Sequence, residues 1–446
     1  MSYNVSFISL GCAKNQVNCE QMMALCSEAG YAIQAEPAGC DVVVVNTCGF
    51  LASACEEAIE NILEMAELKK AGQVKKILVT GCMTQRYKED IFHELPEVDG
   101  LLGTGSYGDI ATAIAEVMEK GEKPCHLGNI HTANQSGERI LSTPPWYAYL
   151  RIAEGCDNHC AYCVIPSLRG KYRSRPMNEL LDEAAELASA GVKELIVIAQ
   201  DITKYGMDLP EHKRLLPELL RELCKMDFTW IRLHYLYPDQ ITDELIDVIA
   251  DEPKIVKYLD IPLQHVSKRI LRAMHRPGDG AEFTRLIEDM RERIPGLVLR
   301  TSLIVGLPGE TEDEFAELCE FLQNVGIERV GVFEYSPEEG TEAAELPDQI
   351  DDETKQNRRL IVEELQSGVL DDYNTSRHGE VMQVLCEGFD EEQGLWYGRT
   401  YADSVEVDGH VYFDAADNEP AEGEFVSVLI TESLGPDLLG VRQKEA

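Results

Sequence analysis

The chain has 446 residues, enough for roughly two to four domains with buried cores. Its 40 basic and 80 acidic side chains give a formal net charge of −40, which repels nucleic-acid phosphates and attracts basic partners. No apolar stretch reaches the roughly 18–20 residues of a membrane span, and the first ten residues lack the basic region of a signal peptide. With 14 cysteines and no secretory features, we expect reduced thiols in a cytoplasmic protein.

The first part of the chain alternates apolar runs with helical patterns. Three continuous apolar runs are typical of buried parallel strands: residues 5–10, 41–46 and 76–80. An amphipathic stretch at residues 15–29 is typical of a helix between them. We therefore predict an open, doubly wound parallel sheet over residues 2–124. Residues 125–145 contain Pro, Ser and Thr without periodicity, and we expect a linker there.

The strand–helix alternation resumes over residues 146–372. The predicted strands are residues 147–153, 194–199, 230–234, 257–261, 298–305 and 330–334. Six strands with helices between them indicate a partial (βα)6 barrel rather than a full eight-stranded one.

The last segment, residues 376–446, has a different pattern. Short strands between turns are predicted at residues 381–389, 395–401, 405–408, 411–414, 425–432 and 439–442. They indicate a small antiparallel β-barrel, a fold used for oligonucleotide or peptide contacts.

A cysteine loop with the spacing C-x3-C-x2-C follows the first strand of the predicted partial barrel, and its members are Cys156, Cys160 and Cys163. Three thiolates on one short loop can bind three irons of a cubic iron–sulfur cluster and leave the fourth iron open to substrate. Because the loop follows a strand, we expect it at the C-terminal mouth of the barrel, where barrel active sites form. The alternatives are three unrelated thiols or a zinc site with His159, whose neighbours do not follow a zinc-finger spacing.

A second set of cysteines follows the three predicted strands of the first domain: Cys12, Cys48 and Cys82. The carboxyl ends of parallel strands meet in one crevice, so these thiols could converge. The residues before them, Gly11, Thr47 and Gly81, are small enough for a close approach of the loops. A single cysteine is by default a small buried apolar residue, but the repeated placement favours a second three-thiolate cluster.

The C-x3-C-x2-C loop closely resembles that of the radical S-adenosylmethionine (SAM) enzymes. Both cysteine sets together, with a terminal β-barrel, resemble the methylthiotransferase family over essentially the whole chain. The resemblance implies an N-terminal methylthiotransferase domain, a radical SAM domain and a TRAM domain. It also implies two 4Fe–4S clusters, SAM as the cofactor, and insertion of a methylthio group into an unactivated C–H bond.

The family has two branches, one that modifies a tRNA adenosine and one that modifies an aspartate of protein twelve of the small ribosomal subunit. Segments that resemble the second branch are residues 9–15, 46–50, 147–150, 165–170, 233–235, 260–265, 398–399, 402–403 and 407–409. Two departures are Val-Asn-Cys-Glu at residues 17–20, where Val-Asp-Ser-Glu is usual, and Ile202 after Gln-Asp, where Thr is common. Residues 376–446 carry 16 acidic and 4 basic side chains, which independently favours a basic protein over tRNA. A tRNA substrate remains the alternative.

The resemblance also implies roles for individual residues. One SAM methylates a sulfur on the cluster of Cys12, Cys48 and Cys82. A second SAM, bound at the cluster of Cys156, Cys160 and Cys163, gives the radical that abstracts a hydrogen from the aspartate β-carbon. Candidates for SAM contacts are Tyr162, Gln200 and Asp201, with ordinary loop hydrogen bonding as the alternative, and the turn residues Gly306, Gly309 and Glu310.

Further expectations concern charged groups and partners. Residues 169–175 form a basic island beside the cysteine loop, either an anion contact or a solvated surface face. His234 and His265 are expected to be satisfied core or rim histidines. The implied partners are a basic ribosomal protein or the assembled small subunit and an electron donor such as flavodoxin or ferredoxin, with no membrane.

Overall fold

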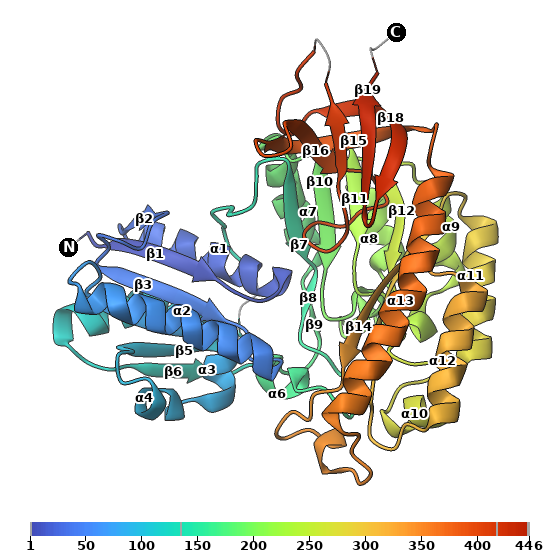
Figure 1. Ribbon diagram of the computed structural model, residues 1–446. Coiled ribbons are helices and arrows are strands. Elements are labelled where there is room, and N and C mark those ends of the chain that lie inside the picture. Colours follow the sequence, from blue (N-terminus) through green and yellow to red (C-terminus); the bar gives the residue numbers. More distant parts are fainter. Residues whose placement is uncertain (1, 134–135, 416–417, 444–446) are drawn as a thin grey trace.

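The computed structural model describes residues 2–133, 136–415 and 418–443, and it has three sheet-based parts in chain order (Figure 1). The predicted linker includes residues 134–135, and the predicted C-terminal barrel includes residues 416–417 and 444–446. These seven residues lie outside the described part. Among the described residues, no helix is both long and apolar enough to cross a membrane.

The first part is a six-stranded parallel sheet in the order β2-β1-β3-β4-β5-β6. Its strands are β1 (Asn4–Ser9), β2 (Ala32–Gln34), β3 (Val42–Thr47), β4 (Lys76–Gly81), β5 (Gly100–Gly105) and β6 (Cys125–Gly128). Val42 and Val44 of the central strand are buried in one hydrophobic cluster, and Val43 and Val45 in another. Both faces of the sheet are therefore covered, as in a doubly wound fold. The last strand, β6, lies within the segment predicted to be a linker.

Helices cover this sheet on both faces, and they are α1 (Ala13–Glu28), α2 (Ala52–Lys70), α3 (Cys82–Tyr87), α4 (Asp90–Glu94) and α5 (Ile110–Ala115). Met22 and Cys26 of α1 pack with Ile110 of α5 on one face, and Ile62 of α2 packs on the other. Burial of these apolar stripes holds the sheet between its helices.

The second part is a six-stranded parallel sheet in the order β14-β13-β12-β11-β10-β7, an open partial barrel with helices outside. Its strands are β7 (Tyr147–Arg151), β10 (Glu194–Ile198), β11 (Trp230–Leu233), β12 (Ile255–Asp260), β13 (Val298–Val305) and β14 (Arg329–Glu334). The main helices are α7 (Met177–Ser189), α8 (Leu216–Leu223), α9 (Asp243–Asp251), α11 (Gly280–Arg293), α12 (Glu312–Val325) and α13 (Asp352–Ser376). The predicted α/β class is confirmed.

The third part is a closed barrel of five strands in the order β15-β16-β17-β19-β18. The strands are β15 (Val381–Asp390), β16 (Leu395–Arg399), β17 (Val411–Asp414), β18 (Phe425–Leu434) and β19 (Asp437–Arg442). The predicted strand at residues 405–408 is wrong, because this segment forms turns. The Asp403 carboxylate accepts hydrogen bonds from the Thr400 backbone N–H (3.2 Å), and the Asp408 carboxylate accepts one from the Ser404 N–H (2.8 Å). These local bonds replace the ladder bonds of a strand.

The turn segment between β16 and β17 fills the inside of the partial barrel. Ala402 and Val405 belong to the same buried cluster as Trp230, Tyr258 and Val298 on the inner face of the strands. At the amino ends of the strands, the Glu194 carboxylate pairs with Arg232 (2.6 Å) and with Arg399 (2.7 Å) of the small barrel. The small barrel therefore closes the amino-terminal end of the partial barrel, and α6 (Ile165–Arg169) lies toward the other end (Figure 1).

Candidate functional site

The cysteines of the loop, here called the radical triad (Cys156, Cys160 and Cys163), lie between β8 (Ala153–Glu154) and α6. The backbone N–H groups of Asn158 and Ile165 donate to Cys156 Sγ (3.4 Å) and Cys163 Sγ (3.5 Å). Burial, with the negative charge of Cys160 as a further cause, raises the pKa of Cys156 to about 11 and that of Cys163 to about 12. The charges of these cysteines therefore influence one another's pKa.

The loop is held in shape by its own residues and by the strand ends below it. Gly155 has φ +80°, and a Cβ there would lie 2.2 Å from the Lys171 carbonyl oxygen. Asn158 Nδ2 donates to the Asp201 carboxylate at 3.1 Å, and this carboxylate also accepts from the Thr203 backbone N–H at 3.0 Å. Asp201 is fully buried. Its side chain fixes the cysteine loop to the end of β10.

Cys160 is surrounded by aromatic and cationic side chains. Its Sγ lies 3.4 Å from the Tyr237 hydroxyl, and the Arg276 guanidinium stacks over the Tyr237 ring at 4.1 Å. Burial raises the pKa of Tyr162 despite Arg276, which opposes the shift, and the negative charge of Cys160 adds to the increase. Tyr162, predicted as a SAM contact, therefore lies beside the sulfur atoms.

The N-terminal triad (Cys12, Cys48 and Cys82) lies at one edge of the first sheet, after β1, β3 and β4. A Cβ on Gly11 would lie 2.7 Å from Cys48 Cβ, and a Cβ on Gly81 would lie 2.4 Å from a carbonyl oxygen of the neighbouring strand. Glycine is therefore required for the strand ends to approach this closely. The strand ends that carry these cysteines therefore lie close together.

The thiols of the N-terminal triad also interact with one another. Burial, with the charges of Cys82 and Cys12 as further causes, raises the pKa of Cys48 to about 12. The pKa of Cys82 is raised by burial, although Arg169 opposes the shift. Cys12 is different, because the positive charges of Lys14 and Arg169 outweigh burial and lower its pKa. Two cations therefore face this triad.

No three His, Cys, Asp or Glu side chains of the described residues are grouped tightly enough to coordinate one metal ion. Thiolates around a single zinc ion with 2.3 Å bonds lie roughly 4 Å apart. A multi-iron cluster holds its thiolates further apart. The absence of such a tight group among the described residues therefore concerns sites for a single metal ion. The six thiols, buried or half-buried in two mutually interacting sets, are soft ligands of the kind that iron–sulfur clusters use.

Arg169 connects the two triads. It is 3% exposed, and its Nη1 donates to Asn18 Oδ1 (3.0 Å) and to Glu154 Oε2 (2.8 Å). Its Nη2 donates to Asn15 Oδ1. Asn15 and Asn18 belong to α1, which begins directly after Cys12, whereas Glu154 precedes the radical triad by two residues. The interpretation of the basic island as a solvated face is therefore wrong for Arg169, and also for the buried Arg175.

Glu154 is the shared acceptor of this network. Burial acts to raise its pKa, but Arg169 and Arg151 outweigh burial and lower it to about 2. Gln200 Nε2 donates to the other Glu154 oxygen at 2.6 Å. The Gln200 Oε1 atom is buried without a hydrogen-bond partner among the described residues. Gln200, predicted as a SAM contact, therefore has a free acceptor beside the radical triad.

The turn after β13 contains the other predicted SAM residues. The Gly306 backbone N–H donates to the Glu310 carboxylate, which also contacts His265 Nε2 (3.3 Å) and Arg358 Nη1 (3.0 Å). The Gly309 N–H donates to the carbonyl oxygen of residue 348 at 2.8 Å. Glu310 is thus buried and fixes the turn, and His265 is a satisfied core histidine, as expected.

Sequence reasoning missed several residues around the triads, namely Lys14, Asn15, Asn18, Glu154, Tyr237 and Arg276. Lys14 and Asn15 come two and three residues after Cys12, and Glu154 comes two residues before Cys156. Proximity to a cysteine was therefore an available signal for three of them. Tyr237 and Arg276 come from separate loops of the barrel and had no such signal.

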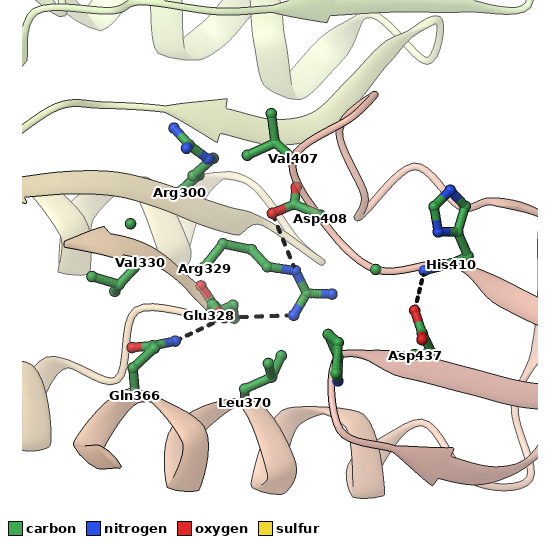
Figure 2. Close-up of a pocket in the computed structure, with 13 residues that line it drawn as sticks. Arg300, Glu328, Arg329, Val330, Gln366, Leu370, Val407, Asp408, His410 and Asp437 are labelled. Carbon is green, nitrogen blue, oxygen red and sulfur yellow. Dashed lines mark hydrogen bonds and ion pairs between the residues drawn. The ribbon is translucent and has the colours of Figure 1, made fainter. Parts of the chain in front are cut away.

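A separate cavity of about 300 Å³ lies where the partial barrel meets the small barrel. Figure 2 shows Arg329 in it, between Glu328 and Asp408. Arg329 Nη2 donates to Asp403 at 2.9 Å, and its Nε lies 3.9 Å from Asp408. None of the six triad cysteines lines this cavity. It belongs to the interface between the barrels and not to the candidate site.

Three family models match the chain. They are the Radical SAM superfamily over residues 150–322, the Uncharacterized protein family UPF0004 over residues 4–103, and the TRAM domain over residues 379–442. The superfamily match implies a 4Fe–4S cluster and SAM as cofactors.

Solved structures with a similar fold include the radical SAM methyltransferase TsrM from Kitasatospora setae, with a TM-score of 0.56 and 14% identity over 74% of this chain and 73% of that chain. The cobalamin-dependent radical enzyme OxsB has a TM-score of 0.53 and 13% identity over 82% of this chain and 56% of that chain. At such low identity the likeness shows the fold alone.

Curated relatives match over nearly the full length. The protein named "Ribosomal protein uS12 methylthiotransferase RimO" from Lachnoclostridium phytofermentans is 47% identical over 98% of this chain and 100% of its own length. The protein of the same name from Caldanaerobacter subterraneus is 48% identical over 98% of this chain and 99% of its own length. With this identity and coverage, the chain belongs to the RimO family of methylthiotransferases, which are radical SAM enzymes.

Proposed function

We propose that the protein replaces a hydrogen on the β-carbon of an aspartate in ribosomal protein uS12 with a methylthio group. In this proposal the radical triad binds one 4Fe–4S cluster and the N-terminal triad binds a second. The clusters and SAM supply the radical and the methylthio group. The observation that carries the proposal is the connection of two three-thiol sets through the buried Arg169, because this reaction needs both centres to reach one carbon.

The residues around the radical triad have two proposed roles. Gln200 offers its unpartnered Oε1 as an acceptor for the SAM amino group, and the ring of Tyr162 borders the adenine. Asp201 and Glu310 are positioning residues, since their carboxylates are occupied by the cysteine loop and by the turn after β13. Gly306 and Gly309 give that turn its backbone shape, with φ +74° at each. Enclosure of the radical by these groups excludes water and side reactions.

The raised pKa values of the thiols indicate that cluster binding must be accompanied by the release of protons. Cys48, Cys156 and Cys163 hold their protons in the metal-free protein, because burial raises each pKa to about 11 or 12. Thiolates are the ligands of iron, so cluster assembly must release these protons. Arg169 and Lys14 assist at the N-terminal triad by stabilising negative charge there.

Charge supports a basic polypeptide as the substrate. The chain carries a formal net charge of −40, and the TRAM segment has four times as many acidic as basic side chains. An acidic surface attracts a basic ribosomal protein and repels tRNA phosphates. The proposed reaction takes place in the cytoplasm, on the free protein or on the assembled small subunit, with electrons from a small carrier such as flavodoxin or ferredoxin.

The test is anaerobic. The protein is reconstituted with iron and sulfide and incubated with SAM, a reductant and a uS12 peptide that contains the target aspartate. We expect a mass gain of about 46 Da on that aspartate, because a methylthio group replaces a hydrogen. A Cys160→Ala variant should give no gain. A gain on an adenosine-containing anticodon stem, with none on the peptide, would instead assign the tRNA reaction.

A further inference from the structure

Lys14 is a buried cation without a carboxylate partner among the described residues. The residue is 7% exposed, and its Nζ lies 3.3 Å above the centroid of the Tyr235 ring. In the described part of the chain, no carboxylate forms an ion pair with this ammonium group within 4.0 Å. Burial of a charge is costly unless an opposite charge or a hydrogen-bonding set compensates for it. The π face of one ring compensates only partly, which leaves room for an anion from outside the chain.

The position of Lys14 relates it to both triads. It lies two residues after Cys12, in the first turn of α1. Tyr235, under its ammonium group, follows the end of β11, and Tyr237, two residues later, contacts Cys160 Sγ at 3.4 Å. The ammonium group therefore lies between the N-terminal triad and the strand end that reaches the radical triad. The reacting carbon must reach this region to meet both centres.

The aromatic platform under Lys14 is held in an unfavourable backbone conformation. Tyr235 has φ +65°, a region that bulky side chains rarely occupy. Its backbone N–H donates to Asp260 Oδ2 (3.4 Å), and its carbonyl oxygen accepts from the Ile202 N–H (3.1 Å). Such conformations persist only where the surroundings impose them, and they cluster at ligand sites. The strand end therefore places the ring where it supports Lys14.

The other cations of this region already have anions. Arg169 pairs with Glu154 at 2.8 Å, and Arg300 pairs with Asp260 at 3.0 Å. Arg169 also faces the thiols of Cys12 and Cys82 and so supplies positive charge to the N-terminal triad. Charge compensation at that triad thus does not depend on Lys14 alone.

We propose that the ammonium group of Lys14 binds the side-chain carboxylate of the target aspartate. This inference rests on the proposed function and names the residue that selects its substrate. The carboxylate is bonded directly to the β-carbon, so an ion pair at Lys14 fixes the reacting carbon one bond away. SAM also has a carboxylate, but its amino-acid part belongs at the radical triad, whereas Lys14 lies on the side of the N-terminal triad. The selected ligand is therefore the aspartate.

The experiment measures binding in two proteins and two peptides. The reconstituted full-length protein and a Lys14→Met variant are titrated anaerobically, in the presence of SAM and without reductant, with the uS12 peptide and with the same peptide carrying Asn at the target position. Methionine matches the length of lysine and keeps the helix propensity. We expect the wild-type protein to bind the Asp peptide about tenfold or more tightly than the Asn peptide, as for a charge-assisted contact. The variant should lose this preference and bind the Asn peptide as the wild type does.

Controls separate the proposal from its alternatives. Lys225→Met removes an exposed lysine and should leave the preference intact, and Lys14→Arg should retain most of it. If the Lys14→Met variant kept the preference, or lost affinity for both peptides equally, the proposal would be wrong. A loss of bound iron in that variant would instead assign Lys14 to the N-terminal triad. A changed SAM affinity without peptide would assign it to SAM. Failure of the wild type to bind either peptide would overturn the proposed function itself.

Discussion

The radical triad and the N-terminal triad are formed by different parts of the fold. The radical triad lies within eight consecutive residues, so one loop brings its thiols together. The N-terminal triad draws its thiols from three strand ends, and two glycines without room for a Cβ allow these ends to meet. The first arrangement depends on the local conformation of a loop. The second depends on the register and packing of a whole sheet, so it should respond more strongly to changes far from the cysteines.

The sharpest test of this comparison removes one thiol from each triad. We expect Cys48→Ala and Cys160→Ala each to lower the bound iron by about half, because each abolishes one cluster. Cys160→Ala should also abolish 5′-deoxyadenosine formation, whereas Cys48→Ala should retain it and lose only methylthiolation. Iron analysis and chromatography of SAM products provide the readouts. Loss of SAM cleavage in Cys48→Ala would mean that the two triads do not act separately.

Arg169 tests how strongly the triads depend on each other. Its replacement by methionine leaves Asn15, Asn18 and Glu154 without their shared donor. Breaking a buried ion pair costs about 3–5 kcal/mol, and because Arg151 remains beside Glu154 we expect about 3 kcal/mol. Urea unfolding of the metal-free protein measures this loss. Arg221→Met removes an exposed pair with Glu244 and should cost less than about 1 kcal/mol. Equal effects in the two variants would contradict the connecting role of Arg169.

A methyl group at Gly81 should act mainly on the N-terminal triad. Gly81 has φ +102°, and its Cβ would overlap the neighbouring strand, so Gly81→Ala should destabilise the protein by about 2–3 kcal/mol. Gly30 in the same domain has φ +84° with open space around it, and Gly30→Ala should cost only about 1 kcal/mol. Urea unfolding compares the two variants. If Gly81→Ala lowered iron at the radical triad as much as at the N-terminal triad, the N-terminal triad would not depend on the first sheet more than the radical triad does.

His234 supplies a pH probe at the contact between the partial barrel and the segment between β16 and β17. Its Nε2 contacts Ser404 Oγ at 3.0 Å, and burial lowers its pKa to about 4. The unfolded chain binds a proton near the ordinary pKa of about 6.5, so stability falls as the pH decreases from about 6.5 toward 4. Between pH 6.5 and 5.5 we expect a loss of about 1 kcal/mol, which His234→Gln should remove. Urea unfolding at both pH values measures it. A loss in the transition of the first domain alone would contradict this assignment.

The sequence predicted the three-part architecture and the radical triad, because strand–helix alternation and a compact cysteine spacing are local signals. The N-terminal triad was predicted from the repeated position after a strand, which is local information combined with a rule about parallel sheets. Arg169 could not be placed in the same way. A run of charges indicates exposure, and only the packing of α1 against the cysteine loop, some 150 residues away, reveals that this guanidinium is buried.

Two further features that the sequence did not reveal have different physical origins. The segment at residues 405–408 has the apolar–polar alternation of a strand, but the carboxylates of Asp403 and Asp408 bind the backbone and form turns instead. No prediction was made for Lys14, which is buried because the first sheet and the partial barrel enclose it together. The competition of the Asp side chains for the backbone is local, whereas the burial of Lys14 between domains is a tertiary effect.

The filling of the partial barrel by the segment around Ala402 and Val405 has a kinetic consequence. Because this segment and the small barrel block the amino-terminal end of the partial barrel, molecules must reach the cysteine loop from the other end, which is therefore the entrance. Cofactor and polypeptide must then share that entrance, and the molecule that binds deeper must arrive first and depart last. We therefore expect a compulsory order in which SAM precedes the polypeptide and 5′-deoxyadenosine leaves after it. The closed end of the barrel thus sets the order in which substrates bind and products leave, although it contacts no reacting atom.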